Sequence, residues 1–314
     1  MIGQFITNKR LIFKIFMLIG CDLFSSDLDF QTLSNKHFKK LKLRFKNIKF
    51  YNLDPNKKSS KNYSKISVYW GNRINLEILK KMKNLKWIHY GSTGINSDVL
   101  EYAKKQKIKV SNTKKMFDNS VAATAIAFIF SLSRGIHYSL YLRGRKELGS
   151  NFYNRIYKNM NDVFYKKILI VGYGNIGKKI SKICKTMGMS IYAIKSNVKK
   201  GNKYFYDLKN LDSVVKNKDF VINLLPKTKL TQDIFNMKIF KNMSKKSFFI
   251  NLGRGEAVNE KDLEKAIIKK EIGGAALDVI KNEPLKKNFS LLKYNNVIVT
   301  PHIASITNIN SAVD

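Results

Sequence analysis

The sequence is poor in cysteine, proline and acidic residues, and each shortage excludes a class of protein. Among 314 residues there are two cysteines, Cys21 and Cys184, too far apart for a disulfide framework or a metal-binding spacing. Four prolines and 17 glycines exclude a collagen-like or low-complexity chain. No apolar run reaches the roughly 18 residues of a membrane-spanning helix. We therefore expect a cytoplasmic protein without a membrane segment and without a bound metal.

The N-terminal segment has two interpretations. Lys9-Arg10 precedes the apolar stretch Leu11 to Gly20, and the four residues 18–21 resemble a lipoprotein cleavage site. Lys14, however, places a charge inside the apolar stretch, where a signal sequence is uncharged. We interpret Phe13 to Ile19 as a first β-strand.

Acidic residues are scarce: 22 Asp and Glu stand against 59 Lys and Arg, a net charge of +37. Such a charge is typical of proteins that bind nucleic acid or anionic membranes. However, 51 of the cations are lysine, eight are arginine, and asparagine is abundant at 32 residues. An AT-rich coding sequence would produce this composition whatever the function. We attribute most of the charge to composition and keep nucleic-acid binding as an alternative.

The length exceeds what one ordinary core needs, so two domains are expected. In the first 111 residues, short apolar runs predict strands at Ile66 to Trp70, Leu85 to Tyr90 and Ile108 to Val110. Helical patterns separate them at Asn75 to Met82 and Ser97 to Lys105. Apolar and basic residues alternate from Lys40 to Phe50, which predicts a half-exposed strand. These elements indicate a small parallel α/β sheet.

A second and more regular series follows an apolar helix, Ser120 to Arg134, and a polar stretch, Glu147 to Asp162. Six strands are predicted: Lys167 to Val171, Ser190 to Ile194, Phe220 to Leu225, Ser247 to Leu252, Ala275 to Ile280 and Asn296 to Thr300. Helices are predicted at Ile176 to Met187, Ile234 to Met243 and Lys261 to Lys270, the last behind a capping Asn259. This order predicts a doubly wound parallel sheet.

A glycine-rich turn joins the first of these strands to the helix that follows it. Gly172, Gly174 and Gly177 have the spacing at which glycines permit a tight turn, close approach of a pyrophosphate, and helix-to-strand packing. The phosphates would then bind unpaired N–H groups at the positive end of the helix. The turn predicts a dinucleotide site.

The residues after the second strand of this series bear on the choice of cofactor. An acid that would bind a ribose 2′-hydroxyl is expected there, but the chain has Lys195 and Ser196. A lysine and a hydroxyl can bind a 2′-phosphate instead. We therefore expect NADP(H) to be favoured over NAD(H).

Reactive side chains follow three later strands. Arg254 lies in an Asn-Leu-Gly-Arg-Gly segment, Asp278 begins a segment that ends at Glu283-Pro284, and His302 follows Thr300-Pro301. All would lie at the carboxyl edge of the sheet, where ligands bind. Imidazole can exchange a proton near neutral pH, a neighbouring carboxylate stabilises its protonated form, and a guanidinium can hold a carboxylate or ketone oxygen.

These motifs, in this order, resemble the D-isomer-specific 2-hydroxyacid dehydrogenases, which include glyoxylate/hydroxypyruvate reductases. The match is dense over residues 166–305 and looser over 87–96. The resemblance implies a flavodoxin-like α/β substrate domain, residues 1–111 plus 302–314, and a Rossmann NAD(P)-binding domain, residues 112–301. Ala123 stands where the family usually has an acid.

The resemblance also implies roles for individual residues. Arg254, Glu283 and His302 match the catalytic residues, and Ser92, Thr93 and Gly94, with Arg254, match the substrate-carboxylate site. Asp278 matches the residue that faces the nicotinamide end. The implied cofactor-binding residues are Gly172, Gly174, Asn175, Ile176, Gly177, Lys195, Ser196, Leu225, Pro226, Thr231, Leu252, Gly253 and Asp278.

The implied function is reduction of a small, anionic 2-oxo acid of the glyoxylate or hydroxypyruvate type to a D-2-hydroxy acid, with His302 as proton donor. A homodimer is implied as well. The chain ends at Asp314, twelve residues after His302, so we expect the substrate domain to lack the full C-terminal crossover helix. A regulatory protein that binds NAD(P)H without turnover is an alternative, because function resides in the site and not in the fold.

Overall fold

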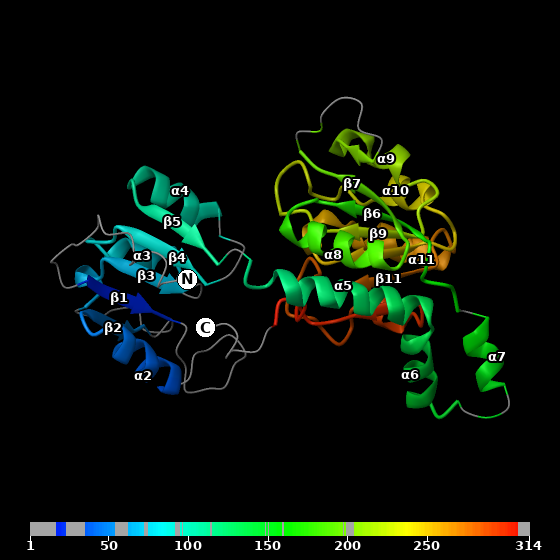
Figure 1. Cartoon of the computed structure of the whole chain (residues 1–314), viewed down its shortest axis with the longest axis horizontal. Coiled ribbons are helices and arrows are strands. Elements are labelled where there is room, and N and C mark those ends of the chain that lie inside the picture. Colours follow the sequence, from blue (N-terminus) through cyan, green and yellow to red (C-terminus); the bar gives the residue numbers. More distant parts are fainter. Residues whose placement is uncertain are drawn as a thin grey trace. The chain divides into compact units, whose positions relative to one another are not determined.

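The structure, a computed structural model, divides into two compact units that are described separately (Figure 1). It describes residues 17–22, 35–53, 62–71, 75–91, 95, 97–113, 115–147, 149, 151–158, 160–196, 198 and 204–306. Unit 1 comprises residues 1–116 and 308–314, and unit 2 comprises 117–307. His302 lies in unit 2, whereas the sequence analysis assigned residues 302–314 to the first domain. Its backbone N–H donates to the Asp278 carbonyl at 2.8 Å, and this contact joins it to unit 2.

Unit 1 is built on a five-stranded parallel sheet in the order β2-β1-β3-β4-β5. This is the flavodoxin-like order, so the predicted fold of the first unit is confirmed. The strands are β1 Met17–Cys21, β2 Ile48–Asn52, β3 Val68–Gly71, β4 Trp87–Tyr90 and β5 Lys109–Asn112. The helices are α2 Asn35–Arg44, α3 Leu76–Lys81 and α4 Ser97–Lys105, with a 3₁₀ turn η1 at Tyr63–Lys65.

The strand predicted from Lys40 to Phe50 is wrong. The chain is helical through Arg44, as the end of α2, and only Ile48–Asn52 forms a strand. Leu41 and Phe45 are four residues apart and therefore share a helical face, with which they pack against the core of buried Ile19, Phe50 and Val68. Leu43, which the alternation placed on the same face, is 72% exposed.

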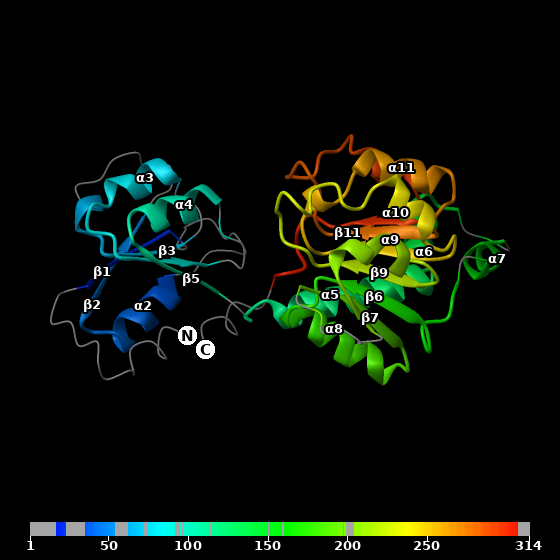
Figure 2. The same cartoon turned by 90° about the horizontal axis from the view of Figure 1, so that it is seen from above.

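Unit 2 contains a seven-stranded parallel sheet in the order β12-β11-β10-β9-β6-β7-β8 (Figure 2). The strands are β6 Lys167–Val171, β7 Ser190–Ile194, β8 Phe205–Tyr206, β9 Phe220–Asn223, β10 Phe248–Asn251, β11 Gly274–Leu277 and β12 Val297–Val299. The chain runs outward from β6 in one direction and from β9 in the other. This reversal is the topological switch point where doubly wound sheets bind dinucleotides, and it confirms the predicted Rossmann architecture.

Helices cover both faces of this sheet. Figure 2 shows α10 and α11 on one face and α5 and α8 on the other. The helices of unit 2 are α5 Asp118–Ser133, α6 Ile136–Gly144, α7 Phe152–Tyr157, α8 Asn175–Thr186, α9 Leu211–Val214, α10 Met237–Asn242 and α11 Glu260–Ile268. The 3₁₀ turns are η2 Leu208–Asn210, η3 Gly255–Ala257 and η4 Ser290–Lys293. Strands β9, β10 and β11 are buried throughout, as expected for strands covered on both faces.

Residues 134–158, which carry α6 and α7, extend away from the helical layers of unit 2 and are called the arm here (Figure 1). Helix α7 lies within the stretch that the sequence analysis left as polar, and none of its residues is buried. Within the part of the chain that the structure describes, no single helix is long and apolar enough to cross a membrane. Only α5 and α6 together, bent by 68°, meet that length and composition.

Candidate active site

The three glycines of the turn after β6 differ in their surroundings. Gly172 has φ +102°, and a Cβ there would lie 2.9 Å from the Leu224 carbonyl carbon. A Cβ on Gly177 would lie 3.1 Å from the Gly172 carbonyl oxygen. A Cβ on Gly174 would meet nothing within 4 Å. Gly172 and Gly177 thus serve packing, whereas Gly174 faces open space.

The open space lies at the N-terminus of α8. Gly174 is the N-cap, and the first-turn N–H groups of Asn175, Ile176 and Gly177 have no acceptor within the helix. Backbone donors at the positive end of a helix, beside a position without a side chain, form a site suited to a pyrophosphate. These residues therefore fit a nicotinamide dinucleotide.

Lys195 and Ser196 directly follow β7, next to this turn in the sheet order. The Lys195 N–H donates to the Tyr206 carbonyl at 3.1 Å, which pairs it with β8. Its Nζ lies 4.7 Å from the centroid of the Phe205 ring, and that ring packs edge-on against Tyr173 at 5.1 Å. Ser196 is exposed. A cation and a hydroxyl are thus available at the end of β7, where many Rossmann domains carry an acid.

Two buried asparagines that the sequence analysis missed fix the loops after β9 and β10. Asn223 Nδ2 donates to Asn251 Oδ1 at 2.9 Å, and both side chains are at most 1% exposed. The Asn223 Oδ1 accepts from the Leu225 N–H at 3.0 Å, and the Asn251 Oδ1 accepts from the Gly253 N–H at 3.2 Å. The polar residue at the end of each apolar run, Val-Ile-Asn and Phe-Ile-Asn, was the available signal.

The loop after β9 contains three of the predicted cofactor residues. Thr231 is 5% exposed, and its hydroxyl donates to the Pro226 carbonyl at 2.7 Å and accepts from the Thr228 N–H at 2.9 Å. Leu225 is 9% exposed, and so is nearly buried, as is Leu252 after β10. The Thr231 hydroxyl thus stabilises the turn between Pro226 and Thr231.

Arg254 lies between two glycines that bring its backbone against neighbouring loops. A Cβ on Gly253 would lie 2.7 Å from the Leu225 carbonyl oxygen, and one on Gly255 would collide with the Ile280 carbonyl group. The half-buried Arg254 side chain donates from Nη1 to the Gly253 carbonyl at 2.7 Å. A guanidinium carries five N–H donors, so Arg254 can keep this contact and still bind a ligand.

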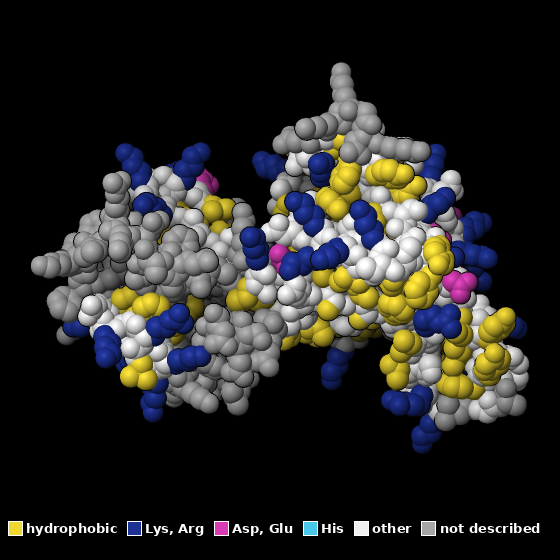
Figure 3. Space-filling model, in the orientation of Figure 1, with side chains coloured by type: hydrophobic (Ala, Val, Ile, Leu, Met, Phe, Trp, Pro, Cys, Tyr) yellow, Lys and Arg dark blue, Asp and Glu magenta, His cyan; other side chains and the backbone are white. Residues whose placement is uncertain are grey.

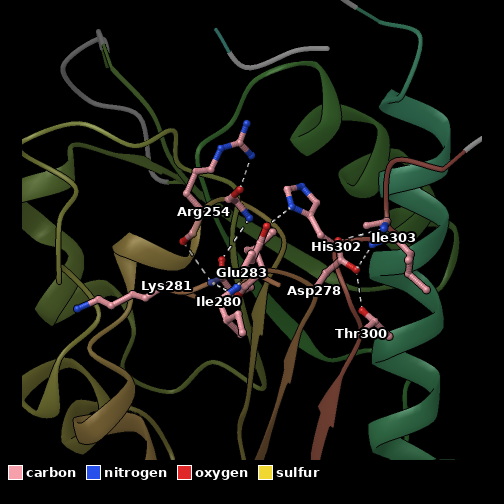
Figure 4. Close-up of polar contacts among 12 residues, drawn as sticks. Arg254, Asp278, Ile280, Lys281, Glu283, Thr300, His302 and Ile303 are labelled. Carbon is pink, nitrogen blue, oxygen red and sulfur yellow. Dashed lines mark hydrogen bonds and ion pairs between the residues drawn. The ribbon is translucent and has the colours of Figure 1, made fainter. Parts of the chain in front are cut away.

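His302 and Glu283 form the ionisable pair of the site. His302 Nδ1 lies 2.7 Å from Glu283 Oε2, and Figure 4 shows the two side chains pointing toward each other. Glu283 Oε1 accepts from the Ile280 N–H at 3.3 Å, which orients the carboxylate. The two side chains are 44% and 36% exposed. With Nδ1–H directed at the carboxylate, Nε2 is left to exchange a proton with a ligand.

The remaining predicted residues fall into two groups. Asp278 is 2% exposed, and its carboxylate accepts from the Thr300 hydroxyl at 2.6 Å. Ser92, Thr93 and Gly94 lie outside the residues that the structure describes. The structure therefore brings Arg254, Glu283 and His302 to one edge of the unit 2 sheet and places Asp278 beneath them.

Comparison with known proteins decides the family. The family model described as "D-isomer specific 2-hydroxyacid dehydrogenase, NAD binding domain" matches residues 126–304, more than half of the chain. The chain belongs to this family. A protein of Staphylococcus saprophyticus named as a 2-hydroxyacid dehydrogenase is 33% identical over 241 residues, which cover 74% of this chain and 73% of that protein.

Other relatives show the range of the family. A Dictyostelium discoideum protein named as a 2-ketogluconate reductase is 28% identical over 75% of this chain and 71% of its own length. The solved structure of an NADPH-dependent glyoxylate/hydroxypyruvate reductase from Sinorhizobium meliloti shares the fold, with a TM-score of 0.77 at 19% identity, covering 95% of this chain and 90% of that one. This dehydrogenase is thus a nicotinamide-dependent oxidoreductase of a family that acts on the CH–OH group of small 2-hydroxy acids or, in reverse, on the carbonyl group of 2-oxo acids.

Proposed function

We propose that this dehydrogenase reduces a small 2-oxo acid, of the glyoxylate or hydroxypyruvate type, to the D-2-hydroxy acid, with His302 as proton donor. The observation that carries the proposal is the 2.7 Å contact between His302 Nδ1 and Glu283 Oε2 at the sheet edge that also holds Arg254. The glyoxylate/hydroxypyruvate reductase of the same fold supports the substrate type.

The residues of this chain can divide the chemistry among them. The nicotinamide cofactor, when bound, supplies the hydride to the carbonyl carbon. His302 donates its Nε2 proton to the carbonyl oxygen, and the Glu283 carboxylate stabilises the imidazolium that precedes this transfer. Arg254 binds the anionic substrate and stabilises the negative charge that develops on the oxygen.

The test is a turnover assay with the purified full chain, following loss of the reduced nicotinamide absorbance with glyoxylate, hydroxypyruvate, pyruvate and 2-ketogluconate. Replacing His302 with alanine should lower kcat by about 10²–10⁴-fold and leave NADPH binding unchanged, because the proton donor does not contribute to cofactor affinity. Full activity in the variant would refute the assignment of the proton donor. A folded wild-type chain that binds NADPH and turns over none of the substrates would favour the regulatory alternative.

We also propose that NADP(H) is favoured over NAD(H). Lys195 supports this, since its ammonium lies at the end of β7 and the preceding residues of the strand include no acid. Changing Lys195 to Asp should lower the ratio of kcat/KM for NADPH to that for NADH by about tenfold or more, the value of one charge-assisted contact to a phosphate. An unchanged ratio would contradict the proposal.

We infer further that the chain forms a homodimer through the arm. Its exposed apolar side chains include Ile136 at 50%, Leu140 at 53%, Tyr153 at 71% and Tyr157 at 62%, and Figure 3 shows apolar side chains gathered over this region. No residue of the six-residue helix α7 is fully buried. Such a short helix has little stability of its own, so a covering partner is expected.

The composition of the arm supports a protein partner. Residues 134–158 contain four arginines and two lysines, whereas the rest of the chain has four arginines and 49 lysines. Arginine and tyrosine are enriched in protein interfaces. A twofold axis would pair the patch with itself, so a second copy of the chain is a sufficient partner.

Sedimentation velocity on the full chain tests this interface. Changing Tyr153 and Tyr157 together to serine should convert a dimer to a monomer, because the aromatic contact area is lost. Ile268→Ser is the control, since Ile268 is 58% exposed at the end of α11 and outside the arm. A dimer that survives the double substitution, or a wild-type monomer, would overturn the inference.

Cys184 supports the proposed cytoplasmic location. It is a free and buried thiol. Burial raises the pKa of the Cys184 thiol to about 12, so the reactive thiolate is not formed near neutral pH. Free thiols are typical of a reducing compartment.

A further inference from the structure

A cavity of about 260 Å³ lies in unit 2 at the amino edge of the sheet, away from the residues discussed so far. The end of α5, the first turn of α6 and residues 158–161 contribute part of its lining. The rest comes from residues that shortly precede three neighbouring strands: Lys245 and Lys246 before β10, Gly273 before β11, and Asn295 and Asn296 before β12.

Hydrogen bonds hold this lining in place. The Asn296 side chain donates from Nδ2 to the Gly273 carbonyl at 3.1 Å, and the Gly273 N–H donates to the Ser247 carbonyl at 2.8 Å. These contacts join the starts of the three strands. On the helical side, His137 Nδ1 lies 2.8 Å from the Ser131 carbonyl oxygen, which fixes α6 against the end of α5. The cavity is therefore formed by contacts within the chain itself.

The charged groups of the lining are all positive. Lys158, Lys245 and Lys246 contribute ammonium groups, and no Asp or Glu is among the described residues that line the cavity. Other lysines of unit 2, such as Lys238 and Lys281, pair with a carboxylate. Within the described part of unit 2, none of the three cavity lysines does so. Unpaired cations around a concave surface raise the positive potential there and concentrate anions.

The kind of cation and the number of charges favour a phosphate. An ammonium group binds phosphate as a point charge, whereas a carboxylate is best matched by the planar fork of arginine, which the lining lacks. Three positive charges also attract a multiply charged anion more strongly than a monoanion. The side chains of Tyr138, Asn161 and Asn295 can donate hydrogen bonds to the remaining oxygen atoms.

We propose that this cavity binds a small phosphate at a site separate from those of the substrate and the cofactor. The strands whose amino ends line it carry Arg254, Glu283 and His302 beyond their carboxyl ends. A four-residue strand spans about 13 Å, so an anion in the cavity does not contact a substrate at the opposite edge. The exposed apolar side chains assigned to the dimer interface do not line the cavity, so the two proposals are independent.

A titration of the full chain, labelled with ¹⁵N-histidine, with inorganic phosphate tests the site without an activity assay. His137 lines the cavity, so its ring resonances should shift and saturate at constant ionic strength and near-neutral pH. His137→Asn identifies these resonances among the four histidines. The Kd for phosphate should be the same with saturating NADPH. A Kd that rises with NADPH, or a shift of the His302 resonances alone, would assign the anion to the cofactor or substrate site and overturn the proposal.

Matched lysine pairs separate a specific site from general attraction to a chain of net charge +37. Changing Lys245 and Lys246 together to glutamine should raise the Kd for phosphate by at least about tenfold, because two charge-assisted contacts are lost. Lys269→Gln with Lys270→Gln is the control, since these exposed neighbours also follow a helix, α11, but lie outside the cavity. The control should change the Kd by less than about twofold. Equal losses in the two variants would refute a site in this cavity.

Two further probes define the ligand. Glycerol 3-phosphate carries the same oxyanion on an organic group, so tighter binding than that of inorganic phosphate would identify a phosphate monoester as the occupant. Equal or weaker binding would identify free phosphate, and either result supports the site. Acetate at the same ionic strength should shift the His137 resonances much less, because it carries a single charge. An equal response to acetate and phosphate would contradict the proposal.

Discussion

The position of Arg254 depends on the hydrogen-bonded pair of Asn223 and Asn251. Asn251 Nδ2 donates to the Arg254 carbonyl at 3.2 Å while its Oδ1 accepts from Asn223. Both amides are buried at the ends of adjacent strands, where an unpaired polar group would be costly. The pair thus couples the loop that carries Arg254 to the loop at the topological switch point.

Replacing Asn251 with leucine should test this coupling. The change leaves Asn223 Nδ2 and the Gly253 N–H without their acceptor, so the free energy of unfolding should fall by about 1–3 kcal/mol. Denaturant unfolding measures the loss. The double variant with Asn223→Leu should lose less than the sum of the two single variants, because the two residues share one hydrogen bond. Additive losses would contradict the coupling.

The catalytic candidates could be predicted residue by residue, and the asparagine pair could not. Arg254 is one of eight arginines and His302 one of four histidines, so each stands out where it follows a strand. Asn223 and Asn251 are two of 32 asparagines, and only their burial distinguishes them. In the same way, the contacts of Asp278 join residues 22 to 26 positions apart, which no local pattern reveals.

At the scale of elements, the turn between β6 and α8 and the turn after β10 use glycine for opposite reasons. Gly174 faces open space, whereas Gly255 is packed against the backbone of Ile280. Neither has a positive φ, so the difference is one of space and not of backbone conformation.

The matched variants Gly174→Ala and Gly255→Ala should therefore behave differently. Gly174→Ala should keep the melting temperature of the wild type but weaken NADPH binding by at least about tenfold, since its Cβ occupies space that the pyrophosphate approaches. Gly255→Ala should lower the free energy of unfolding by about 2 kcal/mol or more, because backbone must move to accept the methyl group. Calorimetry and cofactor titration would separate the two. If Gly174→Ala bound NADPH as tightly as the wild type, the pyrophosphate would not bind beside residue 174.

The elements themselves could be predicted where the periodicity was unambiguous. The predicted bounds of β6, β7 and α4 agree with the structure, and Asn259 caps α11 by accepting from the Asp262 N–H at 3.2 Å. The prediction failed for α2, where lysines on both sides of Leu41 and Leu43 imitated the alternation of a strand. The two-residue strand β8 and helix α7 were too short to produce a periodic signal.

At the scale of the whole molecule, stability depends on histidines outside the site. Burial lowers the pKa of His89 and of His137 below the ordinary value of 6.5. His89 Nδ1 lies 2.8 Å from the Ser111 hydroxyl, and His137 Nδ1 lies 2.8 Å from the Ser131 carbonyl oxygen. The pKa of each ring is therefore lower in the folded chain than in the unfolded chain.

This difference predicts a loss of stability in acid. As the pH falls through about 6.5, the unfolded state binds protons that the folded state excludes, so the stability present above that pH is progressively lost. The melting temperature should fall between about pH 7.5 and pH 5.5, and it should fall less in a His89→Asn or His137→Asn variant than in the wild type. A drop of equal size in the variants would assign the acid sensitivity to other groups.

Because no residue of α7 is fully buried, this helix should unfold locally more often than the rest of unit 2. Amide hydrogens exchange with solvent through openings whose free energy depends on what is buried, and no residue of α7 is fully buried within its own chain. Its amides should exchange almost as fast as those of an unfolded peptide at low protein concentration, while those of β9 and β10 should exchange only through global unfolding. If a second copy covers the arm, the exchange of α7 alone should slow as the protein concentration rises, which makes this short helix an internal reporter of assembly.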